Sequence, residues 1–148
     1  MFAYALRFFI YLVLFTMLAG IVAALLPNVV GQVITAFPFL IAMILVLFRF
    51  LKQQGRAPST KERNQFSLLF VLIFFLYNYI FAVFGPLIFN FTVPNVMELW
   101  RQQAWNQDFQ LLLLSKLMIF MIPFYLVTFW FYGAQAKRMA AKMFPSQD

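Results

Sequence analysis

The sequence predicts an all-α integral membrane protein in which four transmembrane helices form a bundle. Of its 148 residues, 65% are hydrophobic and only 10% are charged, whereas about a quarter of a typical soluble domain is charged. A chain this short cannot bury so much apolar surface in its own core, so lipid is expected to solvate most of it. Four apolar stretches of 19 to 22 residues are each long enough to cross a hydrocarbon core of about 30 Å.

The first predicted span covers residues 8–26. We expect it to remain in the protein, because its apolar run is longer than the core of a secretory signal peptide. Pro27 should end it. Small residues recur at four-residue spacing on this helix, which predicts a helix-packing face for close contact within the chain or with another protein. These small residues are Ala19, Gly20, Ala23 and Ala24.

The other predicted spans cover residues 33–51, 66–85 and 111–132. Pro38 and Pro123 lie inside the second and fourth of these, where each proline removes a backbone hydrogen bond and should bend its helix. Gly85 and Pro86 are expected to end the third span. All four spans form one predicted membrane domain, which a basic cytoplasmic tail follows at residues 133–148.

The basic residues are distributed unevenly between the two ends of the predicted bundle. The loop at 27–32 contains no Lys or Arg, and the outer loop at 94–108 contains only Arg101. Cytoplasmic segments usually hold the excess of Lys and Arg, so both termini are predicted to be cytoplasmic. Nine basic residues lie on that side: Arg7, Arg49, Lys52, Arg56, Lys61, Arg63, Lys137, Arg138 and Lys142.

The basic cytoplasmic hairpin at residues 52–64 has a structural interpretation at each position. Gly55 suits the left-handed conformation that ends a helix, and Pro58 stiffens the turn. Ser59 and Glu62 match a capping box, so the third helix should begin before the membrane does. The four cations of the hairpin should attract anionic lipid headgroups, at about 1 kcal/mol per charge. Docking of a protein partner is the alternative role of this hairpin.

The same hairpin resembles a pattern found in a family of short four-span bacterial inner-membrane proteins. The pattern is F-x-x-x-G-R-x-P-S/T-x-x-E-R, and Leu51 stands where it has Phe. The resemblance extends over the whole chain in length and span layout, but over this hairpin alone in residues. It implies the fold and the location, and no activity. The matching residues are Gly55, Arg56, Pro58, Ser59, Glu62 and Arg63.

The outer loop at 94–108 should contain a short amphipathic helix. Asn95 followed by Glu98 fits a helix cap with its partner three residues on. Trp100 and Trp105 suggest that the helix lies in the outer membrane interface, where indole rings are enriched. A lid or a partner-docking helix is the alternative interpretation. The expected apolar face consists of Met97, Trp100 and Ala104.

Two polar residues stand out inside the predicted spans. Lys116 is the one charge well inside a span, and Asn78 is expected at a similar depth on the neighbouring helix. A hydrogen bond between them, or a salt bridge from Lys116 to Glu98 or Asp108, would create a polar site for an anion or a lipid headgroup. Alternatively, Lys116 extends its ammonium group to the interface and Asn78 only fixes helix packing.

The residue types present disfavour an enzyme. The chain has no Cys and no His, so thiolate and imidazole groups are missing as metal ligands and general bases. Its four carboxylates are too few to make a metal site expected. We predict no catalytic residue, metal or cofactor, and no nucleic acid as a partner. The expected function is that of a non-enzymatic accessory, regulatory or immunity-type protein, which acts through another integral membrane protein. The alternative is a small oligomeric transporter or channel that passes anions or amphipaths by Lys116 and Asn78.

Overall fold

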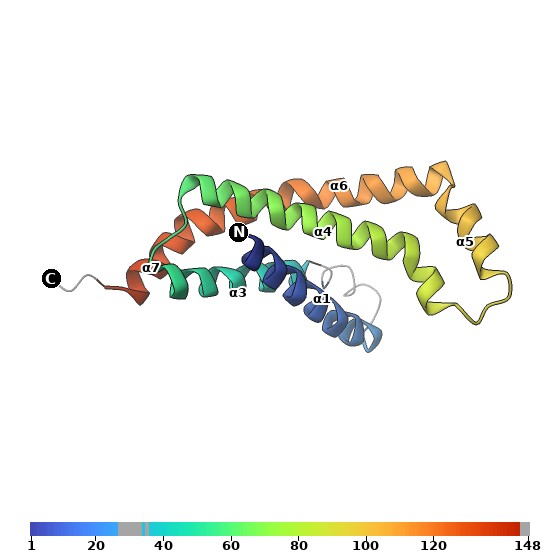
Figure 1. The fold of residues 1–148 in the computed structure, drawn as a ribbon, viewed down its shortest axis with the longest axis horizontal. Helices are drawn as coiled ribbons and strands as arrows, with labels where there is room; N and C mark the ends of the chain where they lie inside the picture. Colours follow the sequence, from blue (N-terminus) through green and yellow to red (C-terminus); the bar gives the residue numbers. More distant parts are fainter. Residues whose placement is uncertain (27–33, 35, 146–148) are drawn as a thin grey trace.

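The computed structural model describes residues 1–26, 34 and 36–145, and the regular structure in this part of the chain is helical throughout. Two helical hairpins lie side by side (Figure 1). The first consists of α1 (Phe2–Ala24) and α3 (Phe37–Gln54), and the second of α4 (Thr60–Phe89) and α6 (Gln107–Trp130). Four helices are long and apolar enough to cross a membrane, which confirms the predicted all-α membrane architecture at that level.

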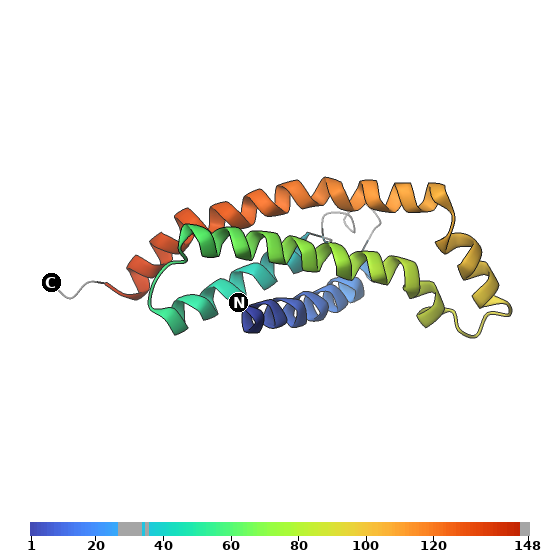
Figure 2. The same cartoon turned by 45° about the horizontal axis from the view of Figure 1, so that its top comes forward.

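The two ends of the bundle differ in the segments they contain. The connection between α3 and α4, residues 55–59, lies at one end, which we call the hairpin end. At the opposite end, α5 (Val96–Ala104) joins α4 to α6, and we call this the α5 end (Figure 1). α4 lies between α6 and α1 (Figure 2).

The fourth span is longer than predicted. α6 continues without a break through the π-helical turn η1 (Phe131–Gln135) into α7 (Ala136–Met143), so helix extends well past the predicted limit at residue 132. The predicted tail at 133–148 is therefore mostly helix, and its last three residues lie outside the described part. The physical reason is packing, because Met139 and Met143 of α7 contact the hydrophobic core. Pro123 lies inside α6 as predicted.

The first two spans differ from the prediction at their ends. α1 begins at Phe2 rather than at residue 8, because no Gly or Pro interrupts residues 2–7. α3 begins at Phe37, so Pro38 lies in the first helical turn. In the first turn a backbone N–H has no partner within the helix, so a proline there removes no hydrogen bond. The prediction that Pro38 bends α3 is therefore wrong. Pro27 and the predicted start of the second span at residue 33 lie outside the described residues.

The third span does not end at Gly85 and Pro86. α4 continues through Pro86 to Phe89, and the N–H of Asn90 donates to the Pro86 carbonyl at 3.0 Å. A proline inside a helix removes one hydrogen bond but does not force termination where neighbouring turns hold the backbone. The last turns of α4 deviate from the line of the rest of the helix (Figure 1). α4 thus projects beyond α1 at the α5 end.

Aromatic rings from all four long helices form the core. The Phe8 ring of α1 stacks on Phe70 of α4, with 4.0 Å between centroids, and Phe39 of α3 stacks on Phe124 of α6 at 4.2 Å. All four rings are buried. Many other large apolar side chains on the same helices are exposed, as expected where lipid rather than water surrounds the bundle.

Candidate functional site

The turn at the hairpin end has the predicted backbone conformation. Gly55 ends α3 with φ of 65°, and its N–H donates to the Leu51 carbonyl at 2.9 Å. Only glycine adopts this left-handed region without a steric cost. Pro58, three residues on, is buried. The turn is therefore tight and packed against the protein.

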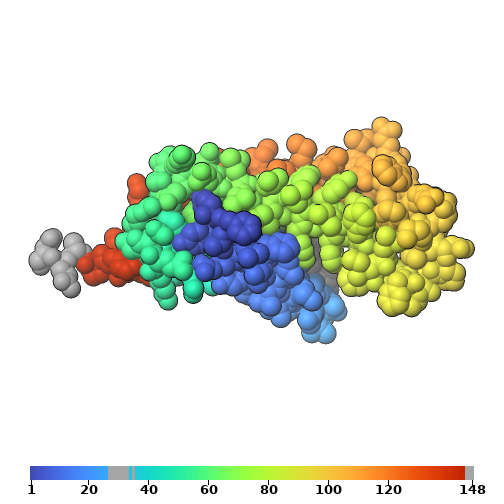
Figure 3. Space-filling view, viewed as in Figure 1, coloured from blue at the N-terminus to red at the C-terminus, as the bar shows by residue number. Residues whose placement is uncertain are grey.

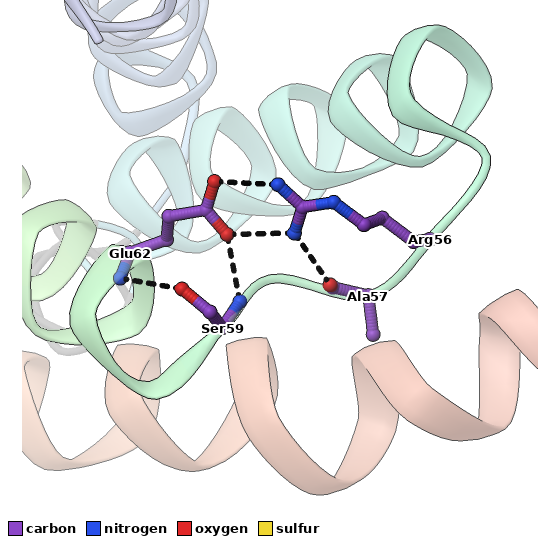
Figure 4. Close-up of polar contacts among 4 residues, drawn as sticks. All are labelled: Arg56, Ala57, Ser59 and Glu62. Atoms are coloured by element: carbon purple, nitrogen blue, oxygen red, sulfur yellow. Dashed lines mark hydrogen bonds and ion pairs between the residues drawn. The ribbon is translucent and has the colours of Figure 1, made fainter.

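The predicted capping box at the start of α4 is present (Figure 4). The backbone N–H of Glu62 donates to Ser59 Oγ at 3.3 Å, and the N–H of Ser59 donates to Glu62 Oε2 at 2.7 Å. These two bonds satisfy two backbone donors that the first turn of a helix leaves without partners. Helix α4 consequently begins at Thr60, before its apolar segment.

Glu62 also holds Arg56 in a bidentate ion pair. Arg56 Nη1 and Nη2 donate to Glu62 Oε2 and Oε1 at 2.8 and 2.9 Å, and Nη1 also reaches the Ala57 carbonyl at 3.1 Å (Figure 4). The pair is partly exposed, so water and salt screen the attraction between its charges. Its main consequence is electrostatic: the Arg56 charge is already compensated within the hairpin.

Arg63 joins the start of α4 to the end of α6. Its Nε and Nη2 donate to the Phe129 carbonyl at 3.2 and 3.0 Å, and its guanidinium lies 4.1 Å from the centroid of the Phe129 ring. A Cβ built on Gly133 would collide with this guanidinium. Gly133 lies inside the π turn η1, whose wider backbone is a local departure from the α-helix. Arg63 is therefore a structural link between two spans.

Gly133 and Tyr132 were not singled out by the sequence. A glycine inside an otherwise helical segment was the available signal for Gly133, because it indicates a close approach. The Tyr132 side chain is fully buried, and its hydroxyl donates to the Met43 carbonyl at 2.8 Å. Nothing in the sequence pairs residues 43 and 132, so only the fold could reveal this bond.

A second polar cluster at the hairpin end joins α1 to α3. Tyr4 Oη and Arg7 Nη1 both donate to Gln53 Oε1, at 3.0 and 3.3 Å. Tyr4 and Arg7 are one helical turn apart, which was the only signal in the sequence. No ion pair holds Arg7 among the described residues.

The structure does not bring Lys116 and Asn78 together. Asn78 Nδ2 donates to the Phe74 carbonyl of its own helix at 2.8 Å, whereas Lys116 is exposed on α6. No hydrogen bond or ion pair within the described ranges joins Lys116 to Asn78, Glu98 or Asp108. Glu98 instead lies 3.9 Å from Arg101 on α5. The contacts required for the predicted polar site are thus missing from this part of the chain.

The short helix α5 forms at the α5 end with Asn95 as its N-cap residue, as predicted, but the expected side-chain cap bond is missing. Asn95 adopts a left-handed conformation with φ of 60° and makes no side-chain cap bond, because asparagine tolerates this backbone region. Trp100 Nε1 donates to the Val83 carbonyl at 2.8 Å, and Ala104 is buried. Met97 is exposed, so only part of the predicted apolar face packs on α4. The position of α5 in a membrane interface stays a prediction.

The small residues of α1 border a notch. A cavity of about 170 Å³ lies between α1, α4 and the start of α3, and Ala19, Gly20 and Ala23 line it together with Thr16 and Asn78. The surface is hollowed between the C-terminal end of α1 and α4 (Figure 3). A Cβ added to Gly20 would meet no described atom within 4 Å. Ala24 is exposed.

Comparison with known proteins does not assign the chain to a family. It matches no protein-family model, no curated protein and no solved structure. The resemblance of residues 51–63 to the four-span family therefore stays a prediction.

Proposed function

We propose that this chain is a non-enzymatic accessory protein of the inner membrane, which acts by binding a helix of another integral membrane protein. The proposal includes the orientation suggested by the basic residues, with the hairpin end and both termini on the cytoplasmic side. Regulation or inhibition of the partner, as in immunity-type proteins, falls within this class.

The notch on α1 is the observation that carries the proposal. Small residues permit close approach of two helices, and in lipid the resulting packing and interhelical hydrogen bonds drive association. Ala19, Gly20 and Ala23 border the notch, and Asn78 offers polar atoms beside them. Among the described residues, no helix of this chain packs against Gly20. A partner helix could approach there as closely as helices do within one protein.

The transporter alternative lacks comparable support. It needs Lys116 and Asn78 on one path, but Asn78 faces the notch beside α1 whereas Lys116 is exposed on α6. In addition, stacked aromatic rings fill the interior of the bundle between the four long helices. These rings belong to Phe8, Phe70, Phe39 and Phe124. We therefore retain only the accessory function.

The test is gentle extraction from native membranes. The chain bears an affinity tag at its C-terminus, and mass spectrometry identifies co-purified protein while a size measurement gives the assembly. We expect a second membrane protein in stoichiometric amount. Gly20→Leu should remove it, because the leucine side chain would occupy the space of the partner backbone.

Ala3→Leu is the matched control, since it places the same side chain on an exposed position of α1 outside the notch. It should leave the recovery of the partner unchanged. Equal recovery with Gly20→Leu would contradict the notch as the binding surface. Recovery of the chain alone as a defined homo-oligomer would contradict the accessory function and favour transport.

A further inference from the structure

We propose that the face shared by α1 and α3 binds one anionic phospholipid, with its phosphate at Arg7 and Arg49 and an acyl chain in an apolar groove between the two helices. The groove borders the notch and shares Ala19, Ile34 and Pro38 with it, but the two arginines lie outside the notch and the inference does not depend on the proposed function. It also differs from the hairpin cations that the sequence suggested for lipid contact, because Arg56 and Arg63 are engaged within the protein.

The first step is the position of Arg7. The side-chain Oε1 of Gln53 accepts from both Tyr4 Oη and Arg7 Nη1, so the guanidinium is held at the edge where α1 meets α3. Arg7 is partly buried, and its single hydrogen bond within the described part of the chain leaves most of its five N–H donors for another acceptor. An organised guanidinium binds phosphate better than a mobile one, since less conformational entropy is lost.

The second step is the local charge. Arg49 is exposed and lies one helical turn before Gln53, so it shares the face of α3 that Gln53 occupies. Within the described part of the chain, Glu62 is paired with Arg56, and Glu98 and Asp108 lie towards the α5 end. No described carboxylate therefore balances the two arginines, and an anion from outside the chain can.

The third step is the groove below the arginines. Phe15, Leu18 and Val22 follow Arg7 along one face of α1, at spacings that return to the same side of a helix. With Phe37, Pro38 and Ile41 of α3, they line a groove of about 250 Å³. Phe15 lies eight residues from Arg7, or about 12 Å. One leaflet of the hydrocarbon core is about 15 Å deep, so an acyl chain descending from Arg7 reaches the groove.

The surroundings favour a lipid over a soluble acidic ligand. Leu6 directly precedes Arg7, and Ile10 lies three residues after it, which is about one helical turn. About half of each of these two side chains is exposed. An arginine beside exposed apolar side chains matches the junction of headgroup and acyl chain, where the long Arg stem stays apolar and its head reaches phosphate. A soluble acid would leave these apolar groups and the groove without a partner.

The experiment is native mass spectrometry of the full chain in a neutral detergent, with equal amounts of phosphatidylglycerol and phosphatidylcholine that have identical long chains. We expect retention of one phosphatidylglycerol in preference to phosphatidylcholine. Arg7→Gln should lower this retention by roughly tenfold, because it removes a charge-assisted bond. Arg49→Gln, at an exposed position where the fold is not at risk, should lower it in the same direction. Lys61→Gln, an equal change of charge on the exposed start of α4, should have no effect.

The other outcomes would overturn the proposal. Equal losses for Lys61→Gln and the two arginine variants would mean that only net charge matters. Equal retention of the two lipids would exclude recognition of the anionic headgroup. If dihexanoyl phosphatidylglycerol is retained as well as the long-chain lipid, the groove holds no acyl chain. Displacement by inorganic phosphate at a similar concentration would assign the arginines to a free anion instead.

Discussion

At the scale of single residues, the two arginines of the hairpin pattern have local structural roles. Arg56 is held by Glu62, six residues further along the chain. Arg63 reaches across to the Phe129 carbonyl at the end of α6. The second contact needs Gly133, because any side chain there would occupy the place of the guanidinium. A basic loop that could have been only a membrane anchor is thus also a connection between spans.

Replacement of Gly133 by alanine should destabilise the protein. The added Cβ displaces the Arg63 guanidinium and breaks its bonds to the Phe129 carbonyl, and leaving such a charged donor without its partner costs about 1–3 kcal/mol. We expect a lower midpoint of unfolding in detergent, measured by circular dichroism. Gly20→Ala is the matched control, since no described atom lies near its new methyl group, and it should leave the midpoint unchanged or raise it slightly. An unchanged midpoint for Gly133→Ala would show that Arg63 contributes little.

At the scale of elements, the helix ends separate what local sequence decides from what it does not. Ser59 and Glu62 form their capping box because both partners lie within four residues. Asn95 has the same sequence signal but makes no cap bond, whereas Asn106 caps α6 by accepting from the Phe109 N–H at 3.1 Å. Trp100 holds α5 against α4 through the Val83 carbonyl, 17 residues away, so the position of α5 depends on a contact that the local sequence does not contain.

Loss of the α4 cap should have a measurable cost. Ser59→Ala removes the acceptor for the Glu62 N–H and should reduce the free energy of unfolding by about 1 kcal/mol. Equilibrium unfolding of the detergent-solubilised protein measures this difference. Ser115→Ala tests the specificity of the effect, because the Ser115 hydroxyl only donates back to the Leu111 carbonyl of its own helix at 2.7 Å. Equal effects of the two substitutions would argue against a special role of the cap.

At the scale of the whole molecule, the two hairpins place the nine basic residues of the hairpin end and termini opposite α5. The absence of native cysteine makes the predicted orientation directly testable with single-cysteine variants. Trp105→Cys, exposed at the α5 end, should react with a membrane-impermeant maleimide in intact spheroplasts, where the outer face of the inner membrane is accessible. Lys61→Cys, exposed at the hairpin end, should react only after the membrane is opened. The reverse pattern would show that the positive-inside rule fails here.

The number of spans and the conformation of the hairpin turn follow from local features of the amino-acid sequence. Span number depends on total apolar length against a fixed membrane thickness, and the turn depends on Gly55, Ser59 and Glu62, which interact within a few residues. Neither feature requires knowledge of distant contacts. Both could therefore be predicted without the fold.

The contacts between polar and small residues, in contrast, depend on how the helices pack. Arg63 with Gly133, Arg7 with Gln53, and the notch beside Gly20 each join segments far apart in the chain. The expected meeting of Lys116 and Asn78 rested on equal depth alone. Depth follows from the rise per residue, but the direction in which a side chain points around its helix depends on how the helices pack. The apolar composition is enough to predict that lipid surrounds this chain. Which side chains come together in a site depends on how each helix is rotated about its axis in the bundle.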